Sequence, residues 1–256
     1  MRNDNQLIEF TKLMQSFAVK NNANNIVFAS FRDNTNDYNT LYAIIVQDEY
    51  DLSKIDFKDN NVFLDVGTHI GSVMLYLISL KKKIKYYAFE PIPENVEMIQ
   101  YNLLLNKLNN KLNAKIFQLA VDKKNGNSFI SYGSMKNKSG KHHHFIGNVI
   151  GNVQDIPQGR KTPIKTITLE KIFKDNKIEH CRVLKLDAEA KEIDILKAAP
   201  KYILKKIDYI IGERHHCFEQ PLLKLTKGLF IAEDCSYRDL ENHLGHFRFR
   251  NECLKT

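Results

Sequence analysis

The sequence predicts an α/β protein whose sheet is mostly parallel, with helices on both faces. From residue 61 onward, short apolar runs alternate with segments of helical periodicity, which is the pattern of successive strand–helix units. A turn with glycine at Gly67 and Gly71 directly follows the first apolar run and opens the first helical segment. Residues 1–60 lack this alternation. We therefore expect a helical and hairpin cap at 1–60, fused to a main domain at 61–256.

The strands are predicted from short runs of apolar, β-branched or aromatic residues bounded by turn residues. The run Val62–Val66 is the clearest, because all of its residues except Asp65 are apolar. In the main domain we expect strands at 62–66, 86–90, 114–121, 128–132, 182–187, 207–213 and 229–232. In the cap we expect a helix at 6–19 and paired strands at 25–30 and 40–46.

The helices are predicted from apolar residues three or four apart and from the residues at their ends. Pro93 suits a first helical turn, Thr168 is a helix-capping residue, and Pro200 ends a helix. The predicted helices cover 72–80, 94–106, 169–174 and 191–199, with another after residue 220.

A long polar segment, residues 133–160, interrupts the alternation. Structureless segments of this length are uncommon in compact domains unless they act as lids or binding loops. We therefore expect it to contact the substrate; a surface insertion without function is the alternative. Within it, His142–His144 are adjacent, so all three side chains cannot easily turn toward one metal ion.

The composition limits where the protein acts and on what. No run approaches the roughly 18 apolar residues of a membrane span, and the first ten residues lack the layout of a secretory signal, so we expect a cytoplasmic protein. The formal net charge is +8, but the lysines are scattered and their densest runs fall near expected helix ends. We therefore expect no nucleic-acid partner, although a positive field also attracts phosphorylated small molecules.

The glycine turn is the sharpest chemical signal. A dinucleotide fingerprint would need glycine where His69 stands, and a phosphate-binding Walker loop would need a lysine after Gly71, where Ser72 stands. The pattern instead suits a ligand with a ribose and an amino-acid tail, which describes S-adenosylmethionine. Gly67 and Gly71 permit close approach of the backbone, and Asp65 can accept from the ammonium. Glu90, at the end of the next strand, can bind the ribose hydroxyls; a solvated strand end is its alternative role.

Three ordered motifs resemble the FkbM-type family of S-adenosylmethionine-dependent methyltransferases. They are Leu64–Gly71 (LDVGTHIG), Ala88–Asn95 (AFEPIPEN) and Leu184–Glu192 (LKLDAEAKE), and the resemblance covers about residues 60–215. It implies a Rossmann-like class I methyltransferase sandwich with a seven-stranded, mostly parallel sheet. Three positions depart from the family pattern: His69 stands where asparagine is usual, Ala190 where glycine is usual, and Lys191 where alanine is usual. The replacement of glycine by Ala190 suggests an altered turn.

The resemblance also implies roles for residues at the ends of the later strands. Asp187 is the first candidate for the catalytic base or for orienting the acceptor, although a carboxylate at a helix start can be purely structural. Glu213 and His215 are the second candidates. His69 would face the cofactor or acceptor unless it simply bonds a backbone carbonyl, and Asp122 would read the adenine ring unless it is an ordinary turn residue. Asp187 and Glu213 could together bind a divalent ion, but no metal is predicted.

These observations predict an O-methyltransferase that moves a methyl group from S-adenosylmethionine to a carbohydrate hydroxyl, with S-adenosylhomocysteine as product. The lysine-, asparagine- and isoleucine-rich composition is typical of an AT-rich bacterial source. A nucleotide-linked sugar or a capsule or lipopolysaccharide precursor is therefore the expected acceptor. The alternatives are methyl transfer to RNA or to a nitrogen or phosphoramidate group, or a non-catalytic binding protein. A homodimer is compatible with the sequence.

Overall fold

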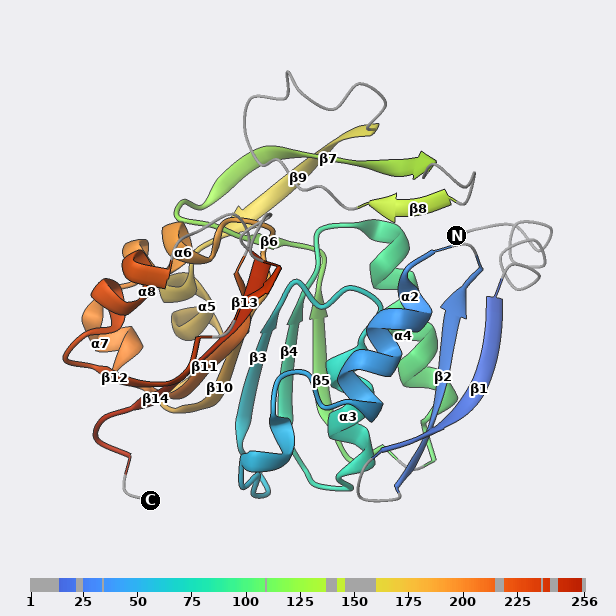
Figure 1. The fold of residues 1–256 in the computed structure, drawn as a ribbon, viewed down its shortest axis with the longest axis horizontal. Helices are drawn as coiled ribbons and strands as arrows, with labels where there is room; N and C mark the ends of the chain where they lie inside the picture. Colours follow the sequence, from blue (N-terminus) through green and yellow to red (C-terminus); the bar gives the residue numbers. More distant parts are fainter. Residues whose placement is uncertain are drawn as a thin grey trace.

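Three β-sheets and the helices that cover the largest one form the described part of the structure (Figure 1). The computed structural model describes residues 14–21, 25–33, 35–108, 110–136, 142–145, 160–214, 219–235, 237–239 and 244–254.

The main sheet has seven strands along its path, and five of them run parallel side by side. In spatial order the strands are β12 (Phe230–Asp234), β14 (Leu244–Asn251), β11 (Ile207–Arg214), β10 (Cys181–Leu186), β3 (Val62–Val66), β4 (Lys85–Phe89) and β5 (Asn113–Phe117). β14 is antiparallel to both of its neighbours, and the short β13 (Tyr237–Asp239) pairs with it. The predicted sheet, including its closing antiparallel part, is confirmed.

Helices pack on both faces of this sheet and define two hydrophobic clusters. One face carries α3 (Ser72–Ser79) and α4 (Pro93–Leu105). The other face carries α5 (Leu169–Asp175), α6 (Glu192–Ala198), α7 (Lys201–Leu204) and α8 (Glu219–Thr226). Alternate residues of a strand point to opposite faces, so Phe63 packs in the first cluster and Leu64 in the second. The helices expected in the main domain are confirmed; α7, which follows Pro200, was not predicted.

The N-terminal segment belongs to the first of these clusters. β1 (Met14–Lys20) and β2 (Ile26–Arg32) form an antiparallel hairpin, followed by α2 (Asp37–Leu41), a π-helical turn (Tyr42–Val46) and a 3-10 turn (Leu52–Lys54). Val27, Leu41 and Ile45 are buried together with residues of β3 and α3. The segment therefore shares the core of the parallel sheet.

Two secondary-structure predictions for this segment are wrong. Of the helix expected at 6–19, residues 6–13 lie outside the described residues, and residues 14–19 form a strand, because Phe17 and Val19 alternate with polar or exposed neighbours and pair with β2. Residues 40–46 are helical where a strand was expected. Their apolar run is buried, and a short apolar run does not distinguish a strand from a buried helical turn.

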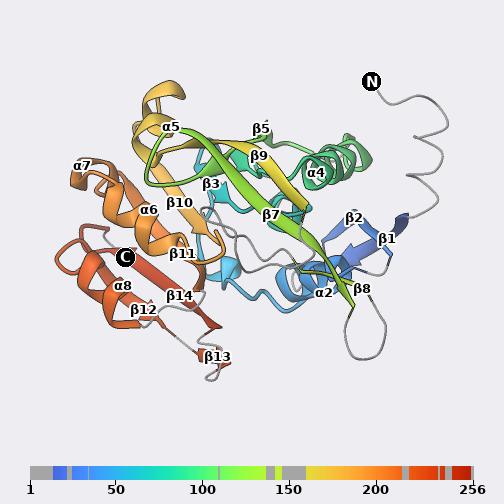
Figure 2. The same ribbon diagram turned by 90° about the horizontal axis from the view of Figure 1, so that it is seen from above.

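A four-stranded sheet lies beyond the end of β5. It contains β6 (Ala120–Val121), β9 (Arg160–Ile167), β7 (Gly126–Lys136) and β8 (His142–Phe145), paired in that order. Figures 1 and 2 show β7 and β9 crossing from the side of α5 toward α2, with β8 above α2. Ile130 and Ile164 pack on Ile92, so this sheet is anchored next to the loop that follows β4.

The four-stranded sheet corrects two further expectations. The strand predicted at 114–121 is divided into β5 and β6, because the chain leaves the main sheet after Phe117 and pairs with β9 instead. Residues 133–136 and 142–145, expected to be loop, are strands, while 137–141 and 146–159 lie outside the described residues. No helix in the described ranges is both long enough and apolar enough to cross a bilayer.

Candidate active site

The turns that follow β3 and β10 touch each other at the carboxyl edge of the sheet. Gly67 has a φ of +73°, and a Cβ placed on it would lie 1.8 Å from the carbonyl oxygen of Asp187. The Gly67 amide donates to the Phe89 carbonyl at 3.0 Å, so the end of β4 joins the same contact. Glycine is therefore required at position 67 both by conformation and by the lack of space.

A buried charge cluster lies directly beneath these turns. The Lys185 ammonium is 3.3 Å from Asp65 Oδ1 and 3.3 Å from Asp187 Oδ2, and it donates to the Gly67 carbonyl at 2.5 Å. Burial alone would lower the pKa of Lys185, but the two carboxylates hold it above its ordinary value. Because Lys185 stays charged, it binds the two strand-end turns to each other.

Asp65 faces the interior. It is fully buried, and its Oδ2 accepts a hydrogen bond from the Tyr86 hydroxyl, while its Oδ1 faces Lys185. Burial, followed by the charge of Asp65, raises the pKa of Tyr86, so the phenol remains a donor. The predicted contact between Asp65 and a ligand ammonium stays a prediction.

Glu90 is buried beside the glycine turn and already accepts three hydrogen bonds. The His69 amide donates to Oε2 at 2.9 Å; the Ile92 amide and the Asn95 side chain donate to Oε1 at 3.0 and 3.2 Å. Burial raises the pKa of Glu90, and these donors partly oppose that effect. A carboxylate offers about four acceptor positions, so Oε2 retains capacity for a ligand hydroxyl.

His69 contacts a residue of the N-terminal segment. Its Nε2 lies 3.2 Å from Asp37 Oδ1, and its backbone φ of 54° is left-handed. Asp37 is held by Arg32, whose Nε and Nη2 donate to the two carboxylate oxygens at 2.8 and 3.0 Å. Burial raises the pKa of Asp37, but the hydrogen bonds from His69 and Arg32 outweigh this and place it well below its ordinary value. The asparagine of the family would also tolerate the left-handed conformation of His69.

Tyr50 closes the other side of the charge cluster. Its hydroxyl donates to Asp187 Oδ2 at 3.2 Å, and its ring lies 5.8 Å from Lys185 Nζ and edge-on to the His246 ring. Burial raises the pKa of Tyr50, and nearby carboxylates, including Asp187 and Glu213, raise it further. The phenol is therefore protonated at neutral pH.

Alternation along the strands places the polar residues of the site on one face. Val183 and Ile211 pack in the first hydrophobic cluster, on the side of the sheet that faces the N-terminal segment. Lys185 and Glu213 lie two positions after them on the same strands, so both lie on that side as well. Glu213 pairs in register with His246 of β14, and His246 lies 3.2 Å from Glu49. The structure thus brings Asp65, Asp187 and Glu213 to one edge, as the sequence predicts.

The turn between β10 and α6 retains a conformation that favours glycine. Glu189 and Ala190 have φ values of 49° and 72°, and the Ala188 amide donates to the Glu192 carboxylate at 2.7 Å. Ala190 adopts this left-handed dihedral despite its methyl group, and the altered turn expected from its replacement of glycine stays a prediction. This conformation costs about 1 to 2 kcal/mol for a residue other than glycine.

The remaining predicted residues lie near this site or outside the described residues. Gly71 precedes α3 with a φ of 89°. Asp122 follows β6, where its side chain accepts from the Lys123 amide at 2.7 Å, as in an ordinary turn. His215 lies outside the described residues, directly after β11. In the part of the chain that the structure describes, no three His, Cys, Asp or Glu side chains gather as metal ligands.

Sequence reasoning missed several residues of this edge. Tyr86, Tyr50, Asp37 and Arg32 carry no motif, and three of them belong to the N-terminal segment. Lys185 belongs to the motif Leu184–Glu192, and its position two residues before Asp187 could have indicated that the two side chains lie close together.

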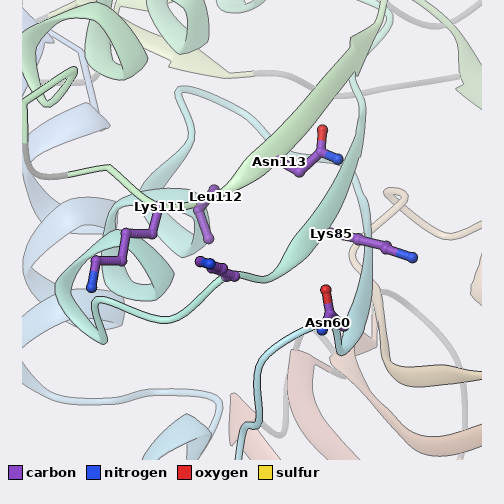
Figure 3. A pocket seen from close by; sticks show the side chains of 6 residues that line it. Asn60, Lys85, Lys111, Leu112 and Asn113 are labelled. Carbon is purple, nitrogen blue, oxygen red and sulfur yellow. The ribbon is translucent and has the colours of Figure 1, made fainter.

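A shallow hollow lies at the opposite edge of the sheet (Figure 3). Its volume is about 350 Å³, and its lining includes Asn60, Lys83, Lys85, Lys111 and Asn113. The Lys85 and Lys111 side chains extend in different directions (Figure 3), so their charges do not converge on one point. This hollow is distant from the strand-end turns and carries none of the predicted site residues.

Comparison with known proteins identifies the family. Residues 65–238, more than half of the chain, match the model of the methyltransferase FkbM domain. This chain belongs to the FkbM family of S-adenosylmethionine-dependent methyltransferases. The resemblance inferred from its three motifs is thereby confirmed. No protein of curated function matches this FkbM methyltransferase significantly.

This FkbM methyltransferase resembles a solved structure of the same family in fold. Methyltransferase FkbM from Methylobacillus flagellatus aligns with a TM-score of 0.50 and 16% identity over 77% of this chain. The alignment covers 45% of that protein, so this chain spans less than half of its length. Fibrillarin, a pre-rRNA processing protein from Methanococcus jannaschii, aligns with a TM-score of 0.47 and 12% identity over 93% of this chain and 83% of its own. TrmK from M. capricolum, solved with S-adenosylhomocysteine, aligns with a TM-score of 0.41 and 13% identity over 78% of this chain and 65% of its own.

Proposed function

We propose that this FkbM methyltransferase transfers the methyl group of S-adenosylmethionine to a hydroxyl of a carbohydrate. The observation that carries the proposal is the carboxyl edge itself, where the glycine turn, Glu90 and Asp187 converge. Ligands of open α/β sheets bind at this edge. The proposal includes the cytoplasm as the compartment and residues 133–160 as the acceptor loop, since β7 and β9 flank that segment and pack beside Ile92.

The residues of the edge fit the cofactor. Glu90 Oε2 has capacity for a ribose hydroxyl, and Gly67 keeps the turn free of a side chain. Four carboxylates, those of Asp187, Glu213, Glu49 and Asp65, act on Tyr50, whereas Lys185 is the buried cation among them. This negative balance favours a cationic ligand, and S-adenosylmethionine supplies an activated methyl group on a sulfonium.

Asp187 is the residue best placed to orient an acceptor hydroxyl. Its side chain is 23% exposed, and Tyr50 and Lys185 fix its Oδ2 from two directions. A fixed carboxylate can accept a hydroxyl proton in a hydrogen bond and hold the oxygen for in-line attack, and such positioning accounts for much of the rate of a displacement reaction. Glu213 and His215 remain the candidates for removing the proton.

The charge of the edge also bears on the acceptor. Asp187 and Glu213 stand beside Tyr50 at the carboxyl ends of β10 and β11, so a polyanionic acceptor such as RNA would meet repulsion from them where its reacting group must enter. A neutral sugar hydroxyl meets no such penalty. A nucleotide-linked sugar or a capsule or lipopolysaccharide unit remains compatible when its phosphates lie away from this edge, and the net charge of +8 favours phosphorylated ligands.

The test begins with calorimetric titration of the purified chain with S-adenosylmethionine and S-adenosylhomocysteine. We expect micromolar binding of both, and at least tenfold weaker binding by Glu90→Gln at a temperature at which this variant is folded; because its amide group replaces one buried acceptor, the variant should also unfold at a lower temperature. Asp187→Asn should reduce turnover far more than cofactor affinity. No binding by the wild-type chain would refute the cofactor and leave a non-catalytic binding protein.

The acceptor is tested separately, by mass spectrometry after incubation with S-adenosylmethionine and panels of nucleotide sugars, neutral oligosaccharides and RNA oligonucleotides. Methylation of a sugar at oxygen is the expected result. RNA binding that weakens steeply with salt, together with methylated RNA, would establish the RNA alternative instead.

A further inference from the structure

A closed ring of side-chain contacts connects the N-terminal segment to Glu90. Two routes join them: Asp37 contacts His69, whose amide donates to Glu90 Oε2, and Arg32 contacts Asn95, whose amide group donates to Glu90 Oε1. Arg32 and Asp37 close the ring through their own paired hydrogen bonds. Both oxygens of Glu90 are thus reached from the same ion pair.

The ring is held rigidly because the hairpin that carries Arg32 is itself attached to the glycine turn. The Asn102 side chain accepts from the Ser30 amide at 2.7 Å and donates to the Ser30 carbonyl at 3.1 Å. The same amide group donates to the Ile70 carbonyl at 2.9 Å. A shift of β2 would therefore move the turn that presents the His69 amide to Glu90.

We propose that Arg32 and Asp37 are positioning residues for the cofactor, which fix Glu90 through His69 and Asn95. The inference rests on the proposed function, because it takes Glu90 as the ribose ligand. Both residues precede residue 65, where the family match begins. This chain then needs its N-terminal segment to bind the cofactor with full affinity.

A second aspartate provides a matched control. Asp208 contacts Arg182 at 3.0 Å and His180 at 2.8 Å, so it has the same kinds of partner as Asp37. It lies at the start of β11, at the opposite edge of the sheet. Loss of its carboxylate should affect stability but not the cofactor.

The experiment compares S-adenosylhomocysteine affinity, by calorimetry, for the wild-type chain, Asp37→Asn and Asp208→Asn. We expect about tenfold weaker binding for Asp37→Asn and a change of less than twofold for Asp208→Asn. Arg32→Lys keeps the positive charge, but its side chain loses one of the two hydrogen bonds that the Arg32 side chain donates to Asp37. We expect its affinity for S-adenosylhomocysteine to be three- to tenfold weaker than that of the wild-type chain. This variant replaces Asp37→Asn in the comparison if Asp37→Asn does not fold.

A double-mutant cycle separates positioning from general destabilisation. In a His69→Asn background, Asp37→Asn should weaken binding by less than threefold, because only the route through Arg32 and Asn95 remains. Equal losses in both backgrounds, or Asp37→Asn binding within twofold of the wild type, would overturn the inference. No binding by the wild-type chain would instead refute the proposed function on which it rests.

Discussion

The two edges of the main sheet carry similar residues and differ in how they are arranged. At the carboxyl edge, Asp65, Lys185 and Glu90 are buried and bonded to one another or to backbone amides. At the amino edge, Lys83 and Lys85 are exposed around a shallow hollow. Residue type alone therefore does not make a site. The carboxyl ends of parallel strands bring their turns together, so charges there must be paired, and paired charges hold a fixed geometry.

The largest effect that distinguishes the edges concerns two lysines. Lys185→Met would leave Asp65 and Asp187 without their buried cation, so we expect the free energy of unfolding to fall by about 3 to 5 kcal/mol. Lys85→Met, at the exposed start of β4, should change it by less than about 0.5 kcal/mol. Urea denaturation measures both, and similar losses for the two variants would contradict the comparison.

A pH dependence distinguishes Asp37 from ordinary surface carboxylates. Its pKa is depressed in the folded protein, so its stabilising contribution is fully present above its unfolded pKa, near 3.9, and is lost as pH falls toward the folded pKa. The free energy of unfolding of the wild-type chain should exceed that of Asp37→Asn by about 2 kcal/mol at pH 7, and the gap should begin to narrow below about pH 4. Urea unfolding of both proteins between pH 7 and pH 3 measures it; a gap independent of pH would disprove the assignment.

A smaller effect is expected at the tyrosine that covers the charge cluster. Tyr50→Phe removes the hydroxyl that donates to Asp187, and turnover should fall by about tenfold with little change in cofactor affinity. Tyr209→Phe is the control, because Tyr209 stacks on Arg182 and Arg248 toward the other edge and should leave turnover unchanged. Steady-state kinetics with an identified acceptor measures the turnover of both variants.

The smallest effect concerns two residues with left-handed backbone. Ala190→Gly should raise the free energy of unfolding by up to about 1 kcal/mol, since glycine adopts its φ of 72° without strain. Lys177→Gly, with a φ of 51° between α5 and β10, should give a similar gain. Thermal unfolding measures both; a loss of stability for Ala190→Gly would show that its methyl group contributes packing that outweighs the strain.

Much of the main domain could be predicted from local sequence. The strand at 62–66 was placed correctly because its apolar run is bounded by a turn, and α5 because Thr168 caps it. The N-terminal errors have a local cause as well, since the run at 40–46 fits a strand or a buried helical turn equally. Nothing local could show that the chain leaves the main sheet after Phe117 to pair with β9, because that partner is over 40 residues away.

The sequence by itself determined the family, the parallel sheet and the edge at which Asp65, Glu90, Asp187 and Glu213 meet. It could do so because strand alternation and glycine turns act over a few residues. Only the tertiary structure decided that Asp65 faces inward to Lys185, and that Tyr50 and Asp37 complete the edge. The Asp65–Lys185 contact depends on the pairing of β3 with β10 across 120 positions. The contacts of Tyr50 and Asp37 depend on how the N-terminal segment packs against the sheet.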